Sequence, residues 1–180
     1  MLETARGFSY DVFNDAKGTE CSIQNSSASG SYIWFGLRRI EPVIEIPDGL
    51  KPVTCLHLKS GTEINLELCE GDIVWNNRMH LSQINASEII ALFEVFRNNG
   101  FFEKLVRKDR HNVEWSIQIT GDYLEIGCDN PDPQICIDGW KELILPENAI
   151  VVTHMFLSVK EIDMLLPLLK TFIETGSISG

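Results

Sequence analysis

Positive charge is scarce in this sequence, and that scarcity disfavours one large class of function. The 180 residues include 26 acidic side chains but 15 basic ones, so the formal net charge at pH 7 is −11. Because proteins bind nucleic acids mainly through attraction between cations and phosphates, we expect no direct binding to DNA or RNA. The acidic excess extends over both halves of the chain, and it leaves room for a local basic pocket.

Long apolar runs are missing as well. Runs such as residues 149–152 are far shorter than the roughly 20 residues that span a bilayer. The first residues, Met1 to Gly7, contain neither an apolar segment nor a cleavage signal. We therefore expect a cytoplasmic protein that does not associate with a membrane.

Cysteines are few, and no two of them form a CxxC motif. They are Cys21, Cys55, Cys69, Cys128 and Cys136. In a reducing compartment, thiols in such a pattern are usually packed as small hydrophobic groups. Pairing of Cys21 with a distant histidine is the alternative, and it would make a thiol nucleophile only if a base lay beside it.

No sequence motif for catalysis is present. The chain has no GxSxG elbow, no phosphate loop, no HExxH and no GxGxxG after a strand. The four histidines lack the spacing of metal ligands. They are His57, His80, His111 and His154. We expect a protein that is not an enzyme and that uses no cofactor or metal.

Neighbouring carboxylates occur at three places in the sequence. They are the pairs Asp129 and Asp132, Glu67 and Glu70, and Glu70 and Asp72. Turns and solvated surfaces are the ordinary explanation for such residues. The alternative is an acidic contact surface that occupies a basic groove of another macromolecule.

Internal similarity is the most informative feature that the sequence does have. Residues 79–100 align without a gap with residues 155–176, and residues 22–24 and 116–118 are both Ser-Ile-Gln. Their shared order indicates a tandem duplication. The first half then carries an extra segment between Pro47 and Trp75.

Each half predicts a few strands followed by one amphipathic helix. Alternating apolar and polar residues, separated by turns that contain glycine, predict the strands. The predicted strands are residues 8–12, 21–23, 33–37, 113–119 and 124–128, with an additional hairpin over residues 53–68. The helices are predicted from Ser82 or Asn85 to Gly100 and from Ser158 to Gly176, because capping residues precede an apolar stripe.

These elements predict an α+β fold of two tandem modules, each with a small antiparallel sheet and one C-terminal amphipathic helix. Residues 1–100 would form the first module, with an extra hairpin near residues 50–70, and residues 101–180 the second. One small sheet and one helix bury too little apolar surface to be stable alone. We therefore expect the modules to pack together as one globule with pseudo-twofold symmetry.

Basic residues are few enough that their clusters stand out. Arg38-Arg39 follows a predicted strand, and Arg78 and His80 precede the first predicted helix. If these points lie close together, they form an anion pocket near a helix N-terminus. The alternative is that Arg38-Arg39 pairs with Glu41 and Glu45 on the surface. The candidate binding residues are Gln24, Ser26, Ser27, Arg38, Arg39, Arg78 and His80, together with Glu67, Glu70 and Asp72 for an acidic contact.

Several segments resemble a family of small proteins encoded by phages and prophages. The similar segments are Arg6-Gly7-Phe8-Ser9-Tyr10, residues 13–18, Cys21-Ser22-Ile23-Gln24-Asn25-Ser26-Ser27-Ala28, Ile33-Trp34-Phe35-Gly36-Leu37, Arg78-Met79-His80-Leu81-Ser82 and residues 165–176. The resemblance leaves out residues 47–75. In the second half, His154 stands where the first half has Arg78. The resemblance implies a protein of a mobile element that acts in the cytoplasm of the host cell, and it implies no particular activity.

Small phage proteins of this kind are often counter-defence factors. We therefore expect a non-enzymatic inhibitor, similar to an anti-CRISPR protein, that binds a host defence protein or ribonucleoprotein complex through an acidic surface. A second hypothesis is a sponge that sequesters a nucleotide second messenger of host defence. A third is a structural protein of a virion or an immunity-type antitoxin.

Overall fold

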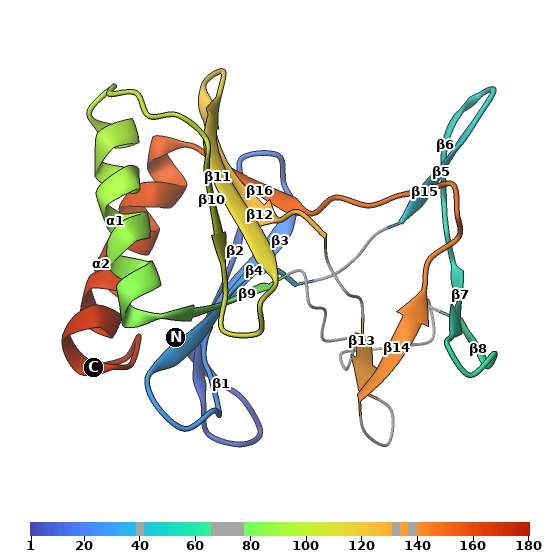
Figure 1. The fold of residues 1–180 in the computed structure, drawn as a ribbon, viewed down its shortest axis with the longest axis horizontal. Helices are drawn as coiled ribbons and strands as arrows, with labels where there is room; N and C mark the ends of the chain where they lie inside the picture. Colours follow the sequence, from blue (N-terminus) through green and yellow to red (C-terminus); the bar gives the residue numbers. More distant parts are fainter. Residues whose placement is uncertain (39–41, 66–77, 131–133, 137–139) are drawn as a thin grey trace.

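The fold is α+β, as the sequence predicts. The computed structural model describes residues 1–38, 42–65, 78–130, 134–136 and 140–180. In these ranges all strand pairs are antiparallel, and there are two helices, one of them at the C-terminal end. Figure 1 shows the two helices side by side on one side of two sheets, with a further group of strands on the opposite side.

The first sheet has the strand order β1-β2-β3-β4-β9. Its strands are β1 (Leu2–Glu3), β2 (Ser9–Asn14), β3 (Glu20–Asn25), β4 (Tyr32–Leu37) and β9 (Arg78–Ser82). Ile23, Phe35 and Met79 lie opposite one another on three neighbouring strands, and all three are fully buried. Because side chains alternate between the faces of a strand, the residues between them point to the opposite face, away from the helices.

The second sheet has the order β10-β11-β12-β16. Its strands are β10 (Leu105–Lys108), β11 (Glu114–Thr120), β12 (Tyr123–Cys128) and β16 (His154–Leu157). Ile117, Ile126 and Met155 form its buried row, in the same way as the row of the first sheet. The predicted strands of both halves are therefore confirmed, although their ends shift by a few residues.

Each sheet leads directly into a helix, α1 (Gln83–Arg97) or α2 (Val159–Thr175). Ser82 caps α1 by accepting the N–H of Asn85 at 3.2 Å. At the start of α2, the backbone N–H of Ser158 donates to the Glu161 carboxylate at 2.8 Å. The helix continues through Pro167 and ends at Gly176, whose left-handed φ of 82° suits a glycine. Both predicted helices are confirmed.

One hydrophobic core joins both sheets and both helices. The apolar stripes of the helices supply Ile89 and Phe93 from α1 and Leu165 and Leu169 from α2, all fully buried against the sheets. Antiparallel sheets often have one face on the core and one face that carries polar side chains. The second face of each sheet is therefore the place to look for a binding site. No helix in the described ranges has the length and apolar character needed to cross a membrane.

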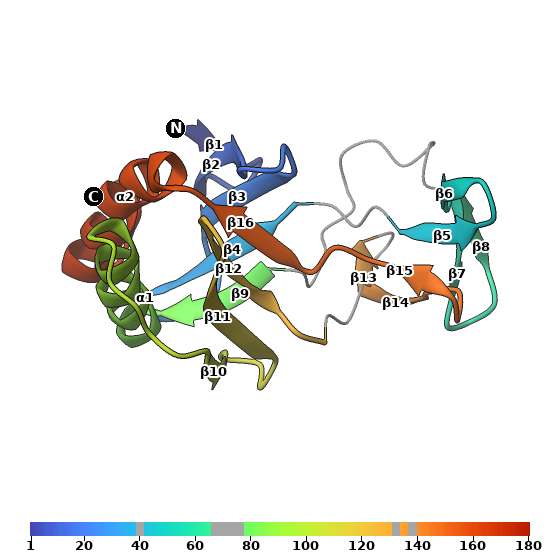
Figure 2. The same cartoon turned by 90° about the horizontal axis from the view of Figure 1, so that it is seen from above.

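The remaining strands form a separate group on the side of the sheets opposite the helices (Figure 2). They pair in the orders β13-β14-β7-β8 and β15-β5-β6. Their bounds are β5 (Val43–Ile46), β6 (Gly49–Pro52), β7 (Cys55–Leu58), β8 (Glu63–Asn65), β13 (Gln134–Cys136), β14 (Trp140–Ile144) and β15 (Ala149–Ile150). Leu56, Leu58 and Leu143 form a small core of their own here.

The predicted extra hairpin is confirmed as β7 and β8 over residues 55–65, and its predicted end at residues 66–68 lies outside the described residues. Its neighbour in the sheet comes from the other half of the sequence, because β14 pairs with β7. In the same way β15 pairs with β5. The distant strands are thus built from both halves, an arrangement that the sequence did not indicate.

Candidate functional site

Arg78 is a buried cation on the face of the first sheet that points away from the helices. Its side chain is 8% exposed, and its Nη1 donates to the Gln24 amide oxygen at 3.2 Å. The guanidinium carbon lies 5.6 Å from the centre of the Trp34 ring. Burial, and then the positive charge of Arg38, lower the pKa of Arg78 to about 10. Arg78 therefore stays charged at neutral pH, yet no carboxylate of the described residues forms an ion pair with it.

His80 lies two residues further along β9, on the same face, and is surrounded by aromatic rings. It is 1% exposed, and its ring centre is 4.2 Å from that of Trp34, 5.1 Å from Tyr32 and 4.8 Å from His111. Its Nε2 is 2.7 Å from Ser26 Oγ, whereas its buried Nδ1 has no hydrogen-bond partner in the described part of the chain.

The charge state of His80 follows from its surroundings. Burial, then the charges of His111, Arg110 and Arg78, lower the pKa of His80 to about 4. The imidazole is therefore neutral at pH 7. A neutral His80 adds no positive charge to the site, so Arg78 and Arg110 are the cations nearest to it.

The loop between β10 and β11 brings Arg110 and His111 to this face. Asp109 is 7% exposed, and its carboxylate accepts the N–H of His111 at 2.8 Å and the N–H of His80 at 3.0 Å. The N–H of Arg110 donates to the carbonyl of His80 at 3.2 Å, and its guanidinium lies 4.3 Å from the centre of the Tyr32 ring. The second sheet thus completes a cluster on the first.

We refer to this group as the Arg78 cluster. It consists of Gln24, Ser26, Tyr32, Trp34, Arg78, His80, Arg110 and His111. It combines aromatic rings, two arginines and hydrogen-bonding side chains. Such a combination suits a ligand with a planar ring and negative charge.

The loop between β2 and β3 of the first sheet makes a similar contact with β16, the last strand of the second sheet. The Asp15 carboxylate accepts the N–H of Phe156 at 3.0 Å, and Ala16 N–H donates to the Phe156 carbonyl at 2.8 Å. The Lys17 ammonium lies 3.5 Å from the centre of the Phe156 ring. Each sheet therefore holds the last strand of the other sheet through one aspartate.

A serine, a histidine and an aspartate meet on the second sheet, but they do not form a catalytic triad. Asp129 Oδ1 accepts the Ser116 hydroxyl at 2.8 Å and lies 2.9 Å from His154 Nε2. In a triad the carboxylate and the hydroxyl bind opposite nitrogens of the histidine. Here both meet at Nε2, and Thr153 Oγ1 is at Nδ1, 2.7 Å away. Ser116 is also only 1% exposed, so the group is an internal polar network.

Cys21 and Cys128 are buried thiols that are poorly suited to act as nucleophiles. Burial raises the pKa of the Cys21 thiol well above its usual range, and burial raises that of Cys128 to about 12. Cys21, Cys55 and Cys128 are free thiols. Within the described ranges, no three His, Cys, Asp or Glu side chains are placed to hold a metal ion.

The structure brings together four of the residues that the sequence proposed for binding, namely Gln24, Ser26, Arg78 and His80. Arg38 is near enough to lower the pKa of Arg78, but its guanidinium pairs with Glu20 at 3.1 Å. Arg38 therefore pairs with Glu20 rather than with Glu45, and the predicted pairing that involves Arg39 and Glu41 lies outside the described residues. Ser27 is exposed. Arg39, Glu41, Glu67, Glu70, Asp72 and Asp132 lie outside the described residues.

Sequence reasoning missed the aromatic half of the cluster. Tyr32 and Trp34 alternate with the buried Ile33 and Phe35, and this alternation places them on the same face as Arg78. Their position on a strand was therefore a usable signal. The position of Arg110 beside Tyr32 could not be predicted in this way, because it depends on how the two sheets pack.

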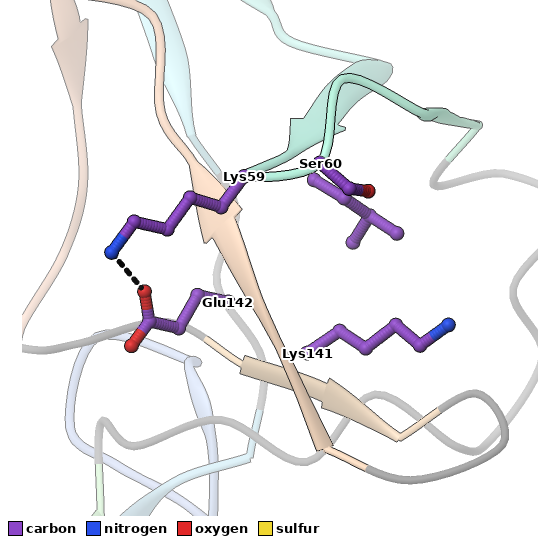
Figure 3. A pocket seen from close by; sticks show the side chains of 5 residues that line it. Lys59, Ser60, Lys141 and Glu142 are labelled. Atoms are coloured by element: carbon purple, nitrogen blue, oxygen red, sulfur yellow. Dashed lines mark hydrogen bonds and ion pairs between the residues drawn. The ribbon is translucent and has the colours of Figure 1, made fainter.

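A shallow hollow elsewhere has weaker features (Figure 3). It lies among the distant strands and is lined by Leu58, Lys59, Ser60, Lys141 and Glu142. Lys59 Nζ pairs with Glu142 Oε2 at 3.0 Å, and both side chains are exposed. Cations that are exposed to water and already paired gain little from a ligand. The Arg78 cluster is therefore the better candidate.

Comparisons with known proteins do not assign the chain to a group. No family model matches the sequence, and no curated protein or solved structure is significantly similar to it.

Proposed function

We propose that the protein is a non-enzymatic binding protein that takes up a nucleotide at the Arg78 cluster. The observation that supports this proposal is the burial of the Arg78 charge without an anionic partner among the described residues. An unpaired charge is costly to bury, and an anion from solution would offset that cost through charge-assisted hydrogen bonds. The ligand would therefore complete an ionic interaction for which the fold supplies one side.

The aromatic residues favour a ligand with a planar ring. Trp34 and Tyr32 are half-buried, in contrast to the fully buried Ile33 and Phe35 between and beside them. Bases stack on such rings and on guanidinium planes, and Arg110 lies over Tyr32 at 4.3 Å. Gln24 and Ser26 add polar atoms beside them. A nucleotide satisfies both requirements, because it carries a base and at least one phosphate.

In the biological setting that the resemblance to phage proteins implies, the protein would be a counter-defence factor. A mobile element that encodes a nucleotide-binding protein without catalytic groups removes a host signal by sequestering it. We thus favour a sponge for a nucleotide second messenger in the host cytoplasm.

We also propose that the two halves are divergent copies of one module, packed with pseudo-twofold symmetry. This is supported by the matching strand order before each helix and by the reciprocal contacts of Asp15 and Asp109. In this proposal both copies keep the fold, and only the first copy carries the Arg78 cluster. His154 and Glu125 stand in the second copy where Arg78 and Trp34 stand in the first.

An inhibitor that binds a host defence protein is the second candidate. Two observations favour it: the net charge of −11, and exposed apolar side chains on the distant strands. The exposed residues are Ile46, Leu50, Ile144 and Ile150. Apolar residues next to the acidic Glu45 and Asp48 suit a basic protein surface. Changing Glu45 and Asp48 to lysine would then weaken capture of the host protein, and unchanged capture would contradict this candidate.

The nucleotide proposal is tested by calorimetric titration and by thermal unfolding with AMP, cyclic AMP and cyclic di-AMP. We expect at least one nucleotide to bind the wild type and to raise its unfolding temperature. Arg78→Met should abolish both effects. Arg107→Met is the matched control, because Arg107 is an exposed arginine paired with Glu88, and it should bind like the wild type. Absence of binding by all three nucleotides to the wild type would overturn the proposal.

A further inference from the structure

Ser22 is a second buried polar group of the first sheet that lacks a partner. Its side chain is 1% exposed, and its Oγ forms no hydrogen bond in the part of the chain that the structure describes. Ser22, Gly36 and Arg78 lie opposite one another on three neighbouring strands. Because Gly36 has no side chain, no group of the central strand separates Ser22 from Arg78. A buried hydroxyl without a partner is uncommon and marks a place where another group is expected.

The second sheet fills the corresponding place with its own carboxylate. Its matching row is Ser116, Gly127 and His154. Asp129 lies beside this row, accepts the Ser116 hydroxyl at 2.8 Å and contacts His154 Nε2 at 2.9 Å. One carboxylate therefore satisfies both the serine and the basic residue of the row.

The first sheet has a cation at the position that corresponds to Asp129. The N–H of Asp129 donates to the carbonyl of Glu114 at 3.1 Å, at the start of the neighbouring strand. The N–H of Arg38 donates to the carbonyl of Glu20 at 3.0 Å, in the same position relative to its own sheet. The first sheet thus replaces the internal anion with a second arginine.

We infer that the row Ser22, Gly36 and Arg78 binds the anionic group of a ligand at the place that Asp129 occupies in the second sheet. Ser22 Oγ donates a hydrogen bond to an oxygen of the anion, and Arg78 supplies the opposite charge. Arg38 adds to the positive potential at the edge of this place. The inference rests on the proposed function, and it assigns the part of the site that holds a phosphate or carboxylate.

The test compares variants that remove the anion site with a variant that fills it. Ser22→Ala removes one hydrogen bond to a charged group, so we expect binding of AMP to weaken by about tenfold or more. Arg38→Asp places a carboxylate where the second sheet has Asp129. This internal anion should abolish binding of AMP and leave the thermal unfolding midpoint unchanged or higher.

Two controls separate these effects from general damage. Arg38→Asn removes the same positive charge without adding a carboxylate, so it should retain measurable binding of AMP. Ser116→Ala makes the same chemical change as Ser22→Ala in the second sheet, and it should bind AMP as the wild type does. If Arg38→Asp does not fold, the comparison of Ser22→Ala with Ser116→Ala decides alone.

The outcomes distinguish this inference from the proposed function. If Arg78→Met abolishes binding while Ser22→Ala binds like the wild type, the nucleotide site remains and the inference is overturned. If the wild type binds none of the three nucleotides used above, both are overturned. Titration with inorganic phosphate and with acetate identifies the anion: tighter binding of phosphate than acetate is expected for a nucleotide ligand, and the reverse would contradict a phosphate group at Ser22.

Discussion

The carboxylate of Asp109 accepts the backbone N–H of His80 at 3.0 Å and ties a loop of the second sheet to the last strand of the first. The same carboxylate also holds its own loop, through the N–H of His111 at 2.8 Å. One side chain therefore fixes both the packing of the sheets and the stack of His111 on His80. The face of the first sheet that carries the Arg78 cluster depends on the second sheet in this way.

Replacing Asp109 with alanine should destabilise the protein by roughly 2–4 kcal/mol, because the backbone N–H groups of His80, His111 and Val113 lose a charged acceptor. Asp15→Ala should have a similar effect, since Asp15 holds Phe156 in the same way. Denaturant unfolding measures the change. Asp122→Ala, in an exposed turn, is the control and should change stability by less than about 0.5 kcal/mol. Equal effects of Asp109→Ala and Asp122→Ala would contradict the role of Asp109.

Arg78→Met should leave the free energy of unfolding unchanged or raise it by about 1 kcal/mol. The reason is that an apolar side chain of similar length removes an unpaired buried charge. Urea unfolding without ligand is the measurement. A loss of several kcal/mol would instead indicate that Arg78 is paired within the protein, and the proposed binding role would lose its main support.

Stability should fall as the pH decreases from about 6.5 towards 4, partly because of His80. Its pKa is lowered to about 4 in the folded protein, so only the unfolded chain takes up a proton on this residue in that range. Protonation thus favours unfolding below about pH 6.5, and the contribution of His80 is complete above it. The charged groups that face the ring are Arg78, Arg110, His111 and Asp109.

The His80→Phe variant isolates this contribution, since phenylalanine occupies the matching position in the second sheet at Phe156. The wild type should lose up to about 2 kcal/mol more than the variant between pH 7 and 4.5. Urea unfolding at several pH values gives the comparison. Parallel curves for the two proteins would show that His80 titrates normally.

The sequence was sufficient for elements whose signals are local. Alternating residues around Ile117 predicted a strand, and Ser158 with Glu161 predicted where α2 begins. Arg78 and His80 also stood out as candidates because the sequence has few basic residues, and the structure places them beside Gln24 and Ser26. What the sequence could not predict depends on contacts between distant segments.

Two contacts of this kind determine the composition of the candidate site and the pairing of the distant strands. Arg110 reaches Tyr32 only because the Asp109 loop crosses from the second sheet to the first. The pairing of β14 with β7 joins residues from opposite halves, and neither strand has a pattern that identifies its partner. Packing, rather than propensity, determines both.

Thiol reactivity should separate the cysteines by burial. Cys21 and Cys128 are buried and their thiol pKa values are raised, so neither should react with an alkylating reagent in the native protein at pH 8. Cys55 is half-buried and should react faster. Mass spectrometry of digested, alkylated protein gives the rates. Rapid native labelling of Cys21 would contradict its packing role.

A crystal structure of the protein with AMP would test the proposed site most directly. We expect the phosphate to lie between Arg78 and Ser22, with the base against Trp34 or Tyr32. A structure in which a carboxylate of the protein itself binds Arg78, with AMP absent from this face, would contradict it.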